Sequence, residues 1–199
     1  MMHPDTKLEW INDQKGFGVV ATAFMPKGTI TWVQDELDIV VPPGKPAQYK
    51  PLTRELFDKY SFRNGKGEYI LCWDIAKYVN HSFNSNCLST AYNFEVAIRD
   101  IAPGEELTDD YGYLNLEEPF VPAEEEAERK IVNPDDTLNL YRQWDDMLKS
   151  LFPLLLEVEQ PLFDLLSDKL QDEVKDVVQG KKKMLSTIKL YYKPKKSRI

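Results

Sequence analysis

The sequence predicts a mainly β fold of several small sheets, followed by an α-helical extension toward the C-terminus. Short runs rich in β-branched and aromatic residues dominate the first half, and prolines and glycines separate them. After Pro119, apolar residues instead recur at helical spacing. The 199 residues, 42% of them hydrophobic, provide for one good-sized core, and this composition excludes a disordered chain as the overall class.

The strands expected in the first half are short. They cover residues 8–11, 17–21, 29–33, 37–41, 69–73, 88–92 and 95–99. One helix is expected between the fourth and fifth of these runs, with Thr53 as its N-cap. Its apolar face carries Leu52, Leu56, Phe57 and Tyr60. We therefore expect several small sheets joined by turns, interrupted by a single helix.

Helices are expected in the second half. Asn133 and Pro134 have the character of an N-cap and a first-turn proline, and Pro153 ends the helical run that follows them. A second amphipathic segment extends from Pro161 to Gly180, and the pattern over residues 184–192 is also compatible with a helix. We expect these helices to fold back onto the β-rich body or onto each other. A homodimer interface, or a contribution to the substrate cleft, is a compatible alternative.

The expected organisation has three parts. A β-rich domain occupies residues 1–118, an acidic linker follows over residues 119–132, and a helical region with a basic tail occupies residues 133–199. Charge separates these parts, because the first 180 residues contain 33 acidic and 17 basic residues, whereas the last 19 contain eight basic residues and no acidic one. The acidic body favours a basic partner and the tail an anionic one. No base-reading motif accompanies the tail, so nucleic acid is disfavoured as a partner.

The sequence also predicts the compartment. Its longest apolar stretch, residues 151–156, is far too short to span a membrane, and no basic region followed by an apolar one begins the chain. Cys72 and Cys87 are too few for a disulfide framework or a zinc cluster. We expect a cytoplasmic protein without membrane contact and without a metal.

Three short strings carry most of the functional information. Residues 78–87 read YVNHSFNSNC, residues 104–113 read GEELTDDYGY, and residues 15–30 contain KGFGVVA and PKGTI. Together, and in their order along the chain, the strings resemble the signature motifs of the SET domain, over roughly residues 7–116. The resemblance implies a β-clip fold with a knot-like crossing of two motifs. It also implies transfer of a methyl group from S-adenosylmethionine to a lysine amine of a protein or peptide, expected to be basic.

The resemblance further implies roles for individual residues. Tyr111 is the expected catalytic residue, with its hydroxyl near the reacting amine and the donor sulfonium. The expected cofactor-binding residues are Gly16, Phe17, Gly18, Asn80, His81 and Tyr111. Tyr113 and Tyr78 are expected to line the channel for the lysine side chain.

The chemistry of methyl transfer to lysine explains why the channel for its side chain needs aromatic walls and fixed oxygen atoms. Lysine has an ordinary pKa of about 10.4, so its deprotonation at pH 7 costs about 4.6 kcal/mol. A narrow apolar channel disfavours the ammonium form, and a nearby positive sulfonium does the same. Because a phenol has a pKa of about 10, we expect Tyr111 to act by electrostatics and orientation rather than as a general base.

One departure from the family pattern is informative. Many relatives have Cys where this chain has Phe83, and that Cys joins three later ones to bind zinc; all four are absent here. The resemblance is therefore to a minimal SET protein, in which Phe120 or the C-terminal helices are candidates for closing the pocket. The alternative is a non-catalytic SET-fold module that serves as a binding or assembly protein.

Overall fold

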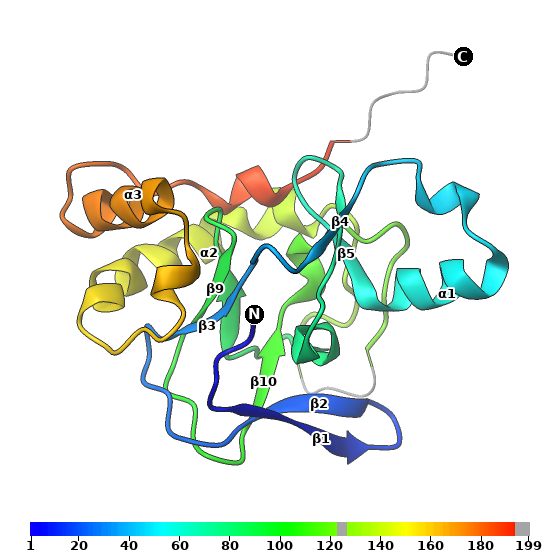
Figure 1. Ribbon diagram of the computed structural model, residues 1–199, viewed down its shortest axis with the longest axis horizontal. Helices are drawn as coiled ribbons and strands as arrows, with labels where there is room; N and C mark the ends of the chain where they lie inside the picture. The colour runs from blue at the N-terminus through cyan, green and yellow to red at the C-terminus, as the bar shows by residue number, and fades with distance from the viewer. Residues whose placement is uncertain (123–126, 194–199) are drawn as a thin grey trace.

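The computed structural model describes residues 1–122 and 127–193, which form three small sheets with helices beside them (Figure 1). The hairpin of β1 and β2 lies at one end, α2 and α3 lie on one side, and α1 lies on the opposite side (Figure 1). Each of the seven expected strand runs overlaps an observed strand. Residues 123–126 of the expected linker and the end of the basic tail, residues 194–199, lie outside the described residues.

The first sheet brings together strands that are distant in the sequence. Its order is β1 (Thr6–Asn12), β2 (Gly16–Ala21), β10 (Glu106–Asp109) and β7 (Asn80–His81). β2 pairs antiparallel with both β1 and β10, whereas β10 and β7 run parallel. This parallel pair joins the two strings that carry the strongest family resemblance.

The other two sheets are antiparallel and three-stranded. One has the order β3 (Ile30–Val33), β9 (Phe94–Ala97) and β8 (Cys87–Ser89). The other has the order β4 (Ile39–Val41), β6 (Tyr69–Leu71) and β5 (Ser61–Arg63). The sequence patterns did not predict β5, β7 and β10, which are two to four residues long and rich in polar side chains.

The first α-helix begins earlier than the sequence predicts. α1 (Pro51–Tyr60) has Lys50 at its N-cap, so the expectation of Thr53 is wrong. Pro51 explains the shift, because its fixed φ suits the first helical turn and its missing N–H is not needed there. Of the expected apolar face only Phe57 is buried, whereas Leu52 is 68% exposed.

The C-terminal helices are shorter than their apolar patterns. α2 spans Asp136–Leu151 and continues past Pro153 as a 3₁₀ turn, η4 (Phe152–Leu156). α3 spans Asp168–Val178 and stops before Gly180, which has a φ of +71°. The segment expected as a third helix forms only the 3₁₀ turn η6 (Thr187–Leu190). Further 3₁₀ turns are η1 (Pro46–Gln48), η2 (Ile75–Tyr78), η3 (Tyr111–Tyr113) and η5 (Phe163–Leu165).

The larger core joins the C-terminal helices to a sheet. Trp144 and Leu148 of α2 pack in one buried cluster with Leu88 and Phe94, which come from β8 and β9. The expectation that the helices fold back onto the body is therefore confirmed. A smaller core lies between the first sheet and β6, around Val19, Leu107 and Ile70. Homodimer formation through the helices stays a prediction.

The last described residues attach to the β5–β6 hairpin. The side chain of Asn115 donates hydrogen bonds to the carbonyls of Arg63 (2.8 Å) and Leu190 (2.7 Å), and its Oδ1 accepts one from the Tyr192 N–H (2.7 Å). The Arg63 guanidinium lies 5.3 Å from the centre of the Tyr192 ring. The C-terminal segment therefore supports a hairpin that also borders the cavity described below.

This attachment predicts an unequal effect of two glycine substitutions. Gly67 and Gly44 have almost the same φ, +84° and +83°. A Cβ on Gly67 would lie 2.3 Å from the Tyr192 ring, whereas a Cβ on Gly44 would meet nothing within 4 Å. Gly67→Ala should lower the free energy of unfolding by about 1–3 kcal/mol more than Gly44→Ala, because only the former overpacks a contact. Urea unfolding measures both; equal losses would contradict the docked position of Tyr192.

Candidate active site

Parallel pairing of β7 and β10 places the two signature strings side by side. Thr108 pairs with Asn80, and Asp109 pairs with His81. Two residues after β10 ends, the backbone N–H of Tyr111 donates a hydrogen bond to Nδ1 of His81 at 3.2 Å. The imidazole therefore braces the crossing, and it fixes the point where the chain turns toward Tyr111.

The glycine-containing turn meets this crossing at Asn80. The Asn80 side-chain amide donates to the carbonyl of Phe17 at 3.0 Å and to Glu106 Oε1 at 2.8 Å. Gly18 allows this contact, because an added Cβ would lie 2.5 Å from Glu106 Oε1 and 2.7 Å from Ile11. The sequence analysis missed Glu106, although it lies within the second string. Its other oxygen pairs with Lys15 at 2.8 Å.

Aromatic rings extend from this turn. Phe17 is 46% exposed and meets the Trp10 ring edge-on, with ring centres 5.3 Å apart. On its other side Phe17 lies 6.2 Å from Tyr78, which in turn lies 5.4 Å from Tyr60. These partly exposed rings lie beside the glycine-containing turn, and together with the backbone of that turn they form what we call the cradle.

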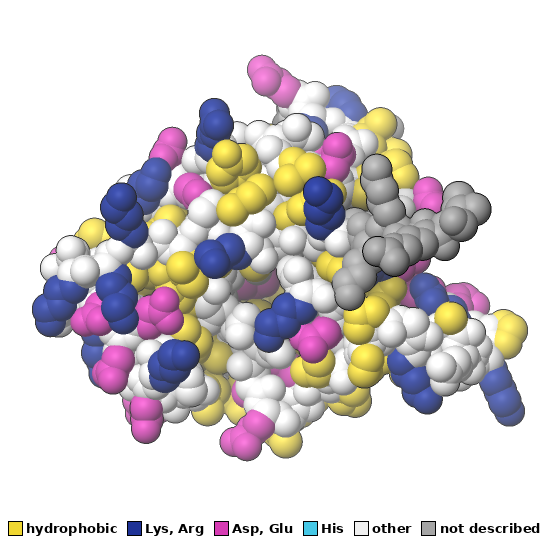
Figure 2. Space-filling model, turned by 90° about the horizontal axis from the view of Figure 1, so that it is seen from above, with side chains coloured by type: hydrophobic (Ala, Val, Ile, Leu, Met, Phe, Trp, Pro, Cys, Tyr) yellow, Lys and Arg dark blue, Asp and Glu magenta, His cyan; other side chains and the backbone are white. Residues whose placement is uncertain are grey.

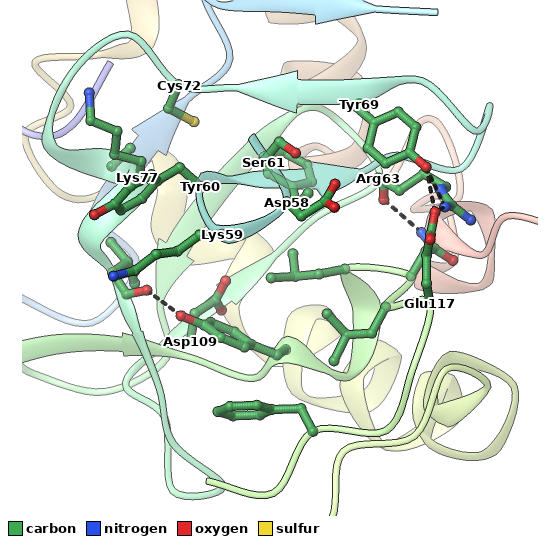
Figure 3. A pocket seen from close by; sticks show the side chains of 18 of the residues that line it. Asp58, Lys59, Tyr60, Ser61, Arg63, Tyr69, Cys72, Lys77, Asp109 and Glu117 are labelled. Atoms are coloured by element: carbon green, nitrogen blue, oxygen red, sulfur yellow. Dashed lines mark hydrogen bonds and ion pairs between the residues drawn. The ribbon is translucent and has the colours of Figure 1, made fainter. Parts of the chain in front are cut away.

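A cavity of about 590 Å³ lies next to the crossing. Tyr111 lines it together with Val79, which precedes Asn80, and with Phe120. Figure 3 shows Lys59, Tyr60 and Lys77 at one end of the cavity, Arg63, Tyr69 and Glu117 at the other, and Asp109 nearer the first group. The cavity is large enough for a lysine side chain and the groups that would fix it.

Tyr111 joins the crossing to the cavity. Its hydroxyl donates a hydrogen bond to the carbonyl of Val79 at 2.8 Å. Burial raises the pKa of this phenol above its ordinary value, and the carboxylates of Asp109 and Glu106 raise the pKa further. The phenol therefore stays neutral at any ordinary working pH. Because its proton is directed to Val79, the lone pairs of its oxygen are free to face positive charge.

Two carboxyl groups, those of Glu95 and Asp109, lie together in the cavity wall. Asp109 is 3% exposed and shares a side-chain hydrogen bond with Glu95, which also accepts from the Ser89 hydroxyl at 3.0 Å. Burial raises the pKa of both groups, and the charge of Glu95 raises the pKa of Asp109 further. Both effects favour a proton shared between the two members over two separate carboxylates. No sequence pattern pointed to Glu95.

This pair predicts a pH dependence of stability. The folded protein keeps a proton that Asp and Glu of the unfolded chain lose near pH 4, so the folded state binds more protons above that pH. The pair's contribution is therefore complete below about pH 4 and declines as pH rises, by at most about 1.4 kcal/mol per pH unit. Urea unfolding from pH 4 to 8 should show a shallower decline for Asp109→Asn than for the parent chain. Identical slopes would exclude a retained proton.

The two tyrosines expected in the channel lie elsewhere. Tyr113 is 3% exposed and packs edge-on against Trp144 in the larger core, 5.3 Å between ring centres, and its hydroxyl accepts from the Ser89 N–H. It does not line the cavity. Tyr78 lies in the aromatic row beside Phe17, next to the cavity rather than in its wall. Tyr60 and Phe62, which the sequence analysis did not single out, line the cavity instead.

The segment after Pro119 covers the crossing. The ring of Phe120 lies 5.7 Å from that of Tyr111 and 5.8 Å from that of His81, in agreement with its expected role in closing the pocket. Phe120 exchanges two backbone hydrogen bonds with Val132, of 2.9 and 2.8 Å. Arg129, within the same segment, binds the carboxylate of Asp110 with both terminal nitrogens. The expected linker therefore contacts the site through Phe120 near its start and through Arg129 near its end.

Within residues 1–122 and 127–193, no group of three or more His, Cys, Asp or Glu side chains is arranged to hold a metal ion. No helix in these two ranges has both the length and the apolar character needed to cross a bilayer.

Comparison with known proteins places this geometry in a family. Residues 16–112 match the family model described as the SET domain. No curated protein matches the sequence. Among solved structures, the chain is similar to a Plasmodium falciparum protein described as a candidate histone methyltransferase, with 18% identity, a TM-score of 0.40, and coverage of 55% of this chain and 95% of that one. The family-model match and the meeting of the motifs agree: residues 16–112 form a SET domain.

Proposed function

We propose that this chain is an S-adenosylmethionine-dependent methyltransferase that acts on the side-chain amine of a protein lysine. The observation that carries the proposal is the position of Tyr111, whose backbone is fixed at the motif crossing and whose hydroxyl lines the adjacent cavity. Tyr111 thus lies between the cradle proposed to bind S-adenosylmethionine and the cavity proposed to hold the lysine side chain.

The residues present fit the cofactor. Gly16 is partly exposed, and Gly18 leaves room for the Asn80 and Glu106 side chains, since an added Cβ at position 18 would collide with Glu106 and Ile11. Asn80 and the backbone of His81 would hold the amino-acid and adenine parts, and the rings of Phe17 and Tyr78 offer apolar surface beside them. When bound, S-adenosylmethionine supplies a methyl group on a positively charged sulfur.

Tyr111 would orient the acceptor. Its neutral hydroxyl is held by Val79, so its oxygen can accept a hydrogen bond from the amine and interact favourably with a nearby cation. Phe120 covers Tyr111 and His81, which restricts water at the crossing.

Charge in the cavity favours a cationic substrate. Five carboxyl groups and three basic groups line it; the acidic residues are Asp58, Glu95, Asp109, Glu117 and Glu118. The face of the molecule in Figure 2 is mixed, with Lys and Arg side chains interspersed with Asp and Glu rather than a wide acidic area. We therefore place selectivity for a lysine in a basic segment at the cavity itself rather than on a wide acidic surface.

Calorimetric titration with S-adenosylmethionine tests the donor site. The parent chain and Gly44→Ala should bind it, whereas Gly18→Ala should bind at least about tenfold more weakly because its methyl group displaces Asn80 and Glu106. Incubation with labelled cofactor and a lysine-rich protein mixture, followed by mass spectrometry, tests transfer. Binding without any methylated lysine would favour the non-catalytic module; absence of binding would refute both cofactor use and catalysis.

A further inference from the structure

The carboxyl pair of Glu95 and Asp109 has no role in the cofactor cradle. Both side chains line the cavity that Tyr111 also lines, and they share a hydrogen bond. Their charges also raise the pKa of the Tyr111 phenol. A carboxyl pair that retains one proton carries a single negative charge and can take up one more proton.

A second observation points to a ligand at the same place. Trp32 is the register partner of Glu95 on the neighbouring strand, and it also lines the cavity. Its side chain is 5% exposed, yet its indole Nε1–H has no hydrogen-bond partner among the described residues. A buried donor without a partner costs free energy unless water or a ligand satisfies it. The carboxyl pair and this donor thus line the same cavity, which can hold water or a small polar group.

We propose that Glu95 and Asp109 are the proton acceptor for the substrate amine in this cavity. The proposal rests on the proposed function, since it assigns the residues that prepare the amine for methyl transfer. The lysine ammonium would donate a hydrogen bond to the pair and then pass one proton to it, either directly or through one water held by Trp32. Tyr111 would orient the same nitrogen.

The proton transfer balances. One N–H bond of the ammonium breaks and its electron pair stays on nitrogen as the lone pair. One O–H bond forms on the carboxyl pair, which changes from one proton and one negative charge to two protons and no charge. The combined charge of the amine and the carboxyl pair is zero before and after the transfer. No isolated ion is therefore left in a buried cavity. The pair releases its extra proton to solvent before the next turnover.

Other ionisable groups surround the pair. Asp110 raises the pKa of Asp109, while the amino group of Met1 lowers the pKa of Glu95. The thiols of Cys72 and Cys87 stay protonated, since burial raises the pKa of both. The remaining ionisable groups of the cavity wall are Asp58, Lys59, Tyr60, Arg63, Tyr69, Lys77, Tyr111, Glu117 and Glu118. None of these other groups shares a side-chain hydrogen bond with either member of the pair.

The first test measures binding without catalysis. n-Butylamine, which reproduces the end of a lysine side chain, is titrated calorimetrically into the parent chain, Asp109→Asn, Glu95→Gln and Asp38→Asn. Asp38 is the matched control, because it is a buried carboxyl with a raised pKa that does not line the cavity. Both pair variants should bind at least tenfold more weakly than the parent chain and Asp38→Asn. Parent-like binding by both pair variants would overturn the proposal.

The second test measures the rate against pH with a lysine substrate found in the labelling experiment. At pH 7 the pair variants should lose about 100-fold in kcat, the lower range for a positioned base. This loss should shrink as pH approaches the lysine pKa of about 10.4, because solvent then removes the proton. A loss independent of pH would indicate a structural role and overturn the proposal. If no substrate is methylated, the proposed function fails, while the butylamine affinities still decide whether the pair receives an amine.

Discussion

Tyr111→Phe should lose about 100- to 1000-fold in kcat for lysine methylation while its affinity for S-adenosylmethionine changes less than threefold. The phenol oxygen is the only atom removed. In the parent chain its proton is directed to the Val79 carbonyl at 2.8 Å, so its lone pairs remain available to the amine. The backbone N–H of Tyr111, which binds His81, is unchanged by the substitution. Methylation rate and calorimetric affinity measure the two effects separately.

The control for this prediction is Tyr113→Phe. That residue occupies the core against Trp144 rather than the cavity wall, so loss of its hydroxyl should leave kcat within about threefold of the parent value and lower stability by about 1 kcal/mol. Near-normal turnover in Tyr111→Phe, or equal losses in the two variants, would refute the role assigned to Tyr111.

Arg129→Met should lower the free energy of unfolding by about 3 kcal/mol, which corresponds to a fall in Tm of about 6–12 °C for a chain of this size. Arg129 binds both oxygens of Asp110, and its Nε lies 3.8 Å from Asp136. Both carboxylates are 5% exposed. Removal of one guanidinium therefore leaves two buried negative charges without their cation. Urea unfolding and thermal melting both measure the loss.

Arg142→Met is the matched control, because Arg142 lies exposed on α2 and contacts only the Tyr141 hydroxyl and ring among the described residues. It should change stability by less than about 0.5 kcal/mol. Asp110→Asn combined with Arg129→Met should recover part of the loss, since one of the unpaired charges is then absent. Equal losses for the two arginine variants would show that the Asp110 contact contributes nothing.

Sequence analysis predicted the parts of the site that local strings define. The fold class and the crossing of residues 78–87 with residues 104–113 follow from the family resemblance, and the parallel pairing of β7 and β10 confirms the crossing. Proline and glycine also marked real helix ends, at Pro153 and Gly180.

The remaining features depend on contacts that no local pattern reveals. Glu95 lies in an ordinary alternating strand, and only the pairing with Trp32 and the approach of β10 bring it to Asp109. Tyr113 was expected in the channel because it lies in residues 104–113. In the structure its ring instead packs against Trp144 of α2 in the larger core. Arg129 follows a run of carboxylates and looked like part of a linker, although two buried carboxylates bind it.

The pairing of β7 with β10 also has a consequence for how the protein folds. Only two residue pairs join these strands, and the bonds that complete the site connect positions 32 and 63 residues apart. Closing such long loops costs entropy that two residue pairs cannot offset alone, so the crossing should form after the hairpins and the C-terminal core are in place. Amides of β7 and β10 should then exchange with deuterium through partial opening, and a bound donor molecule should slow that exchange.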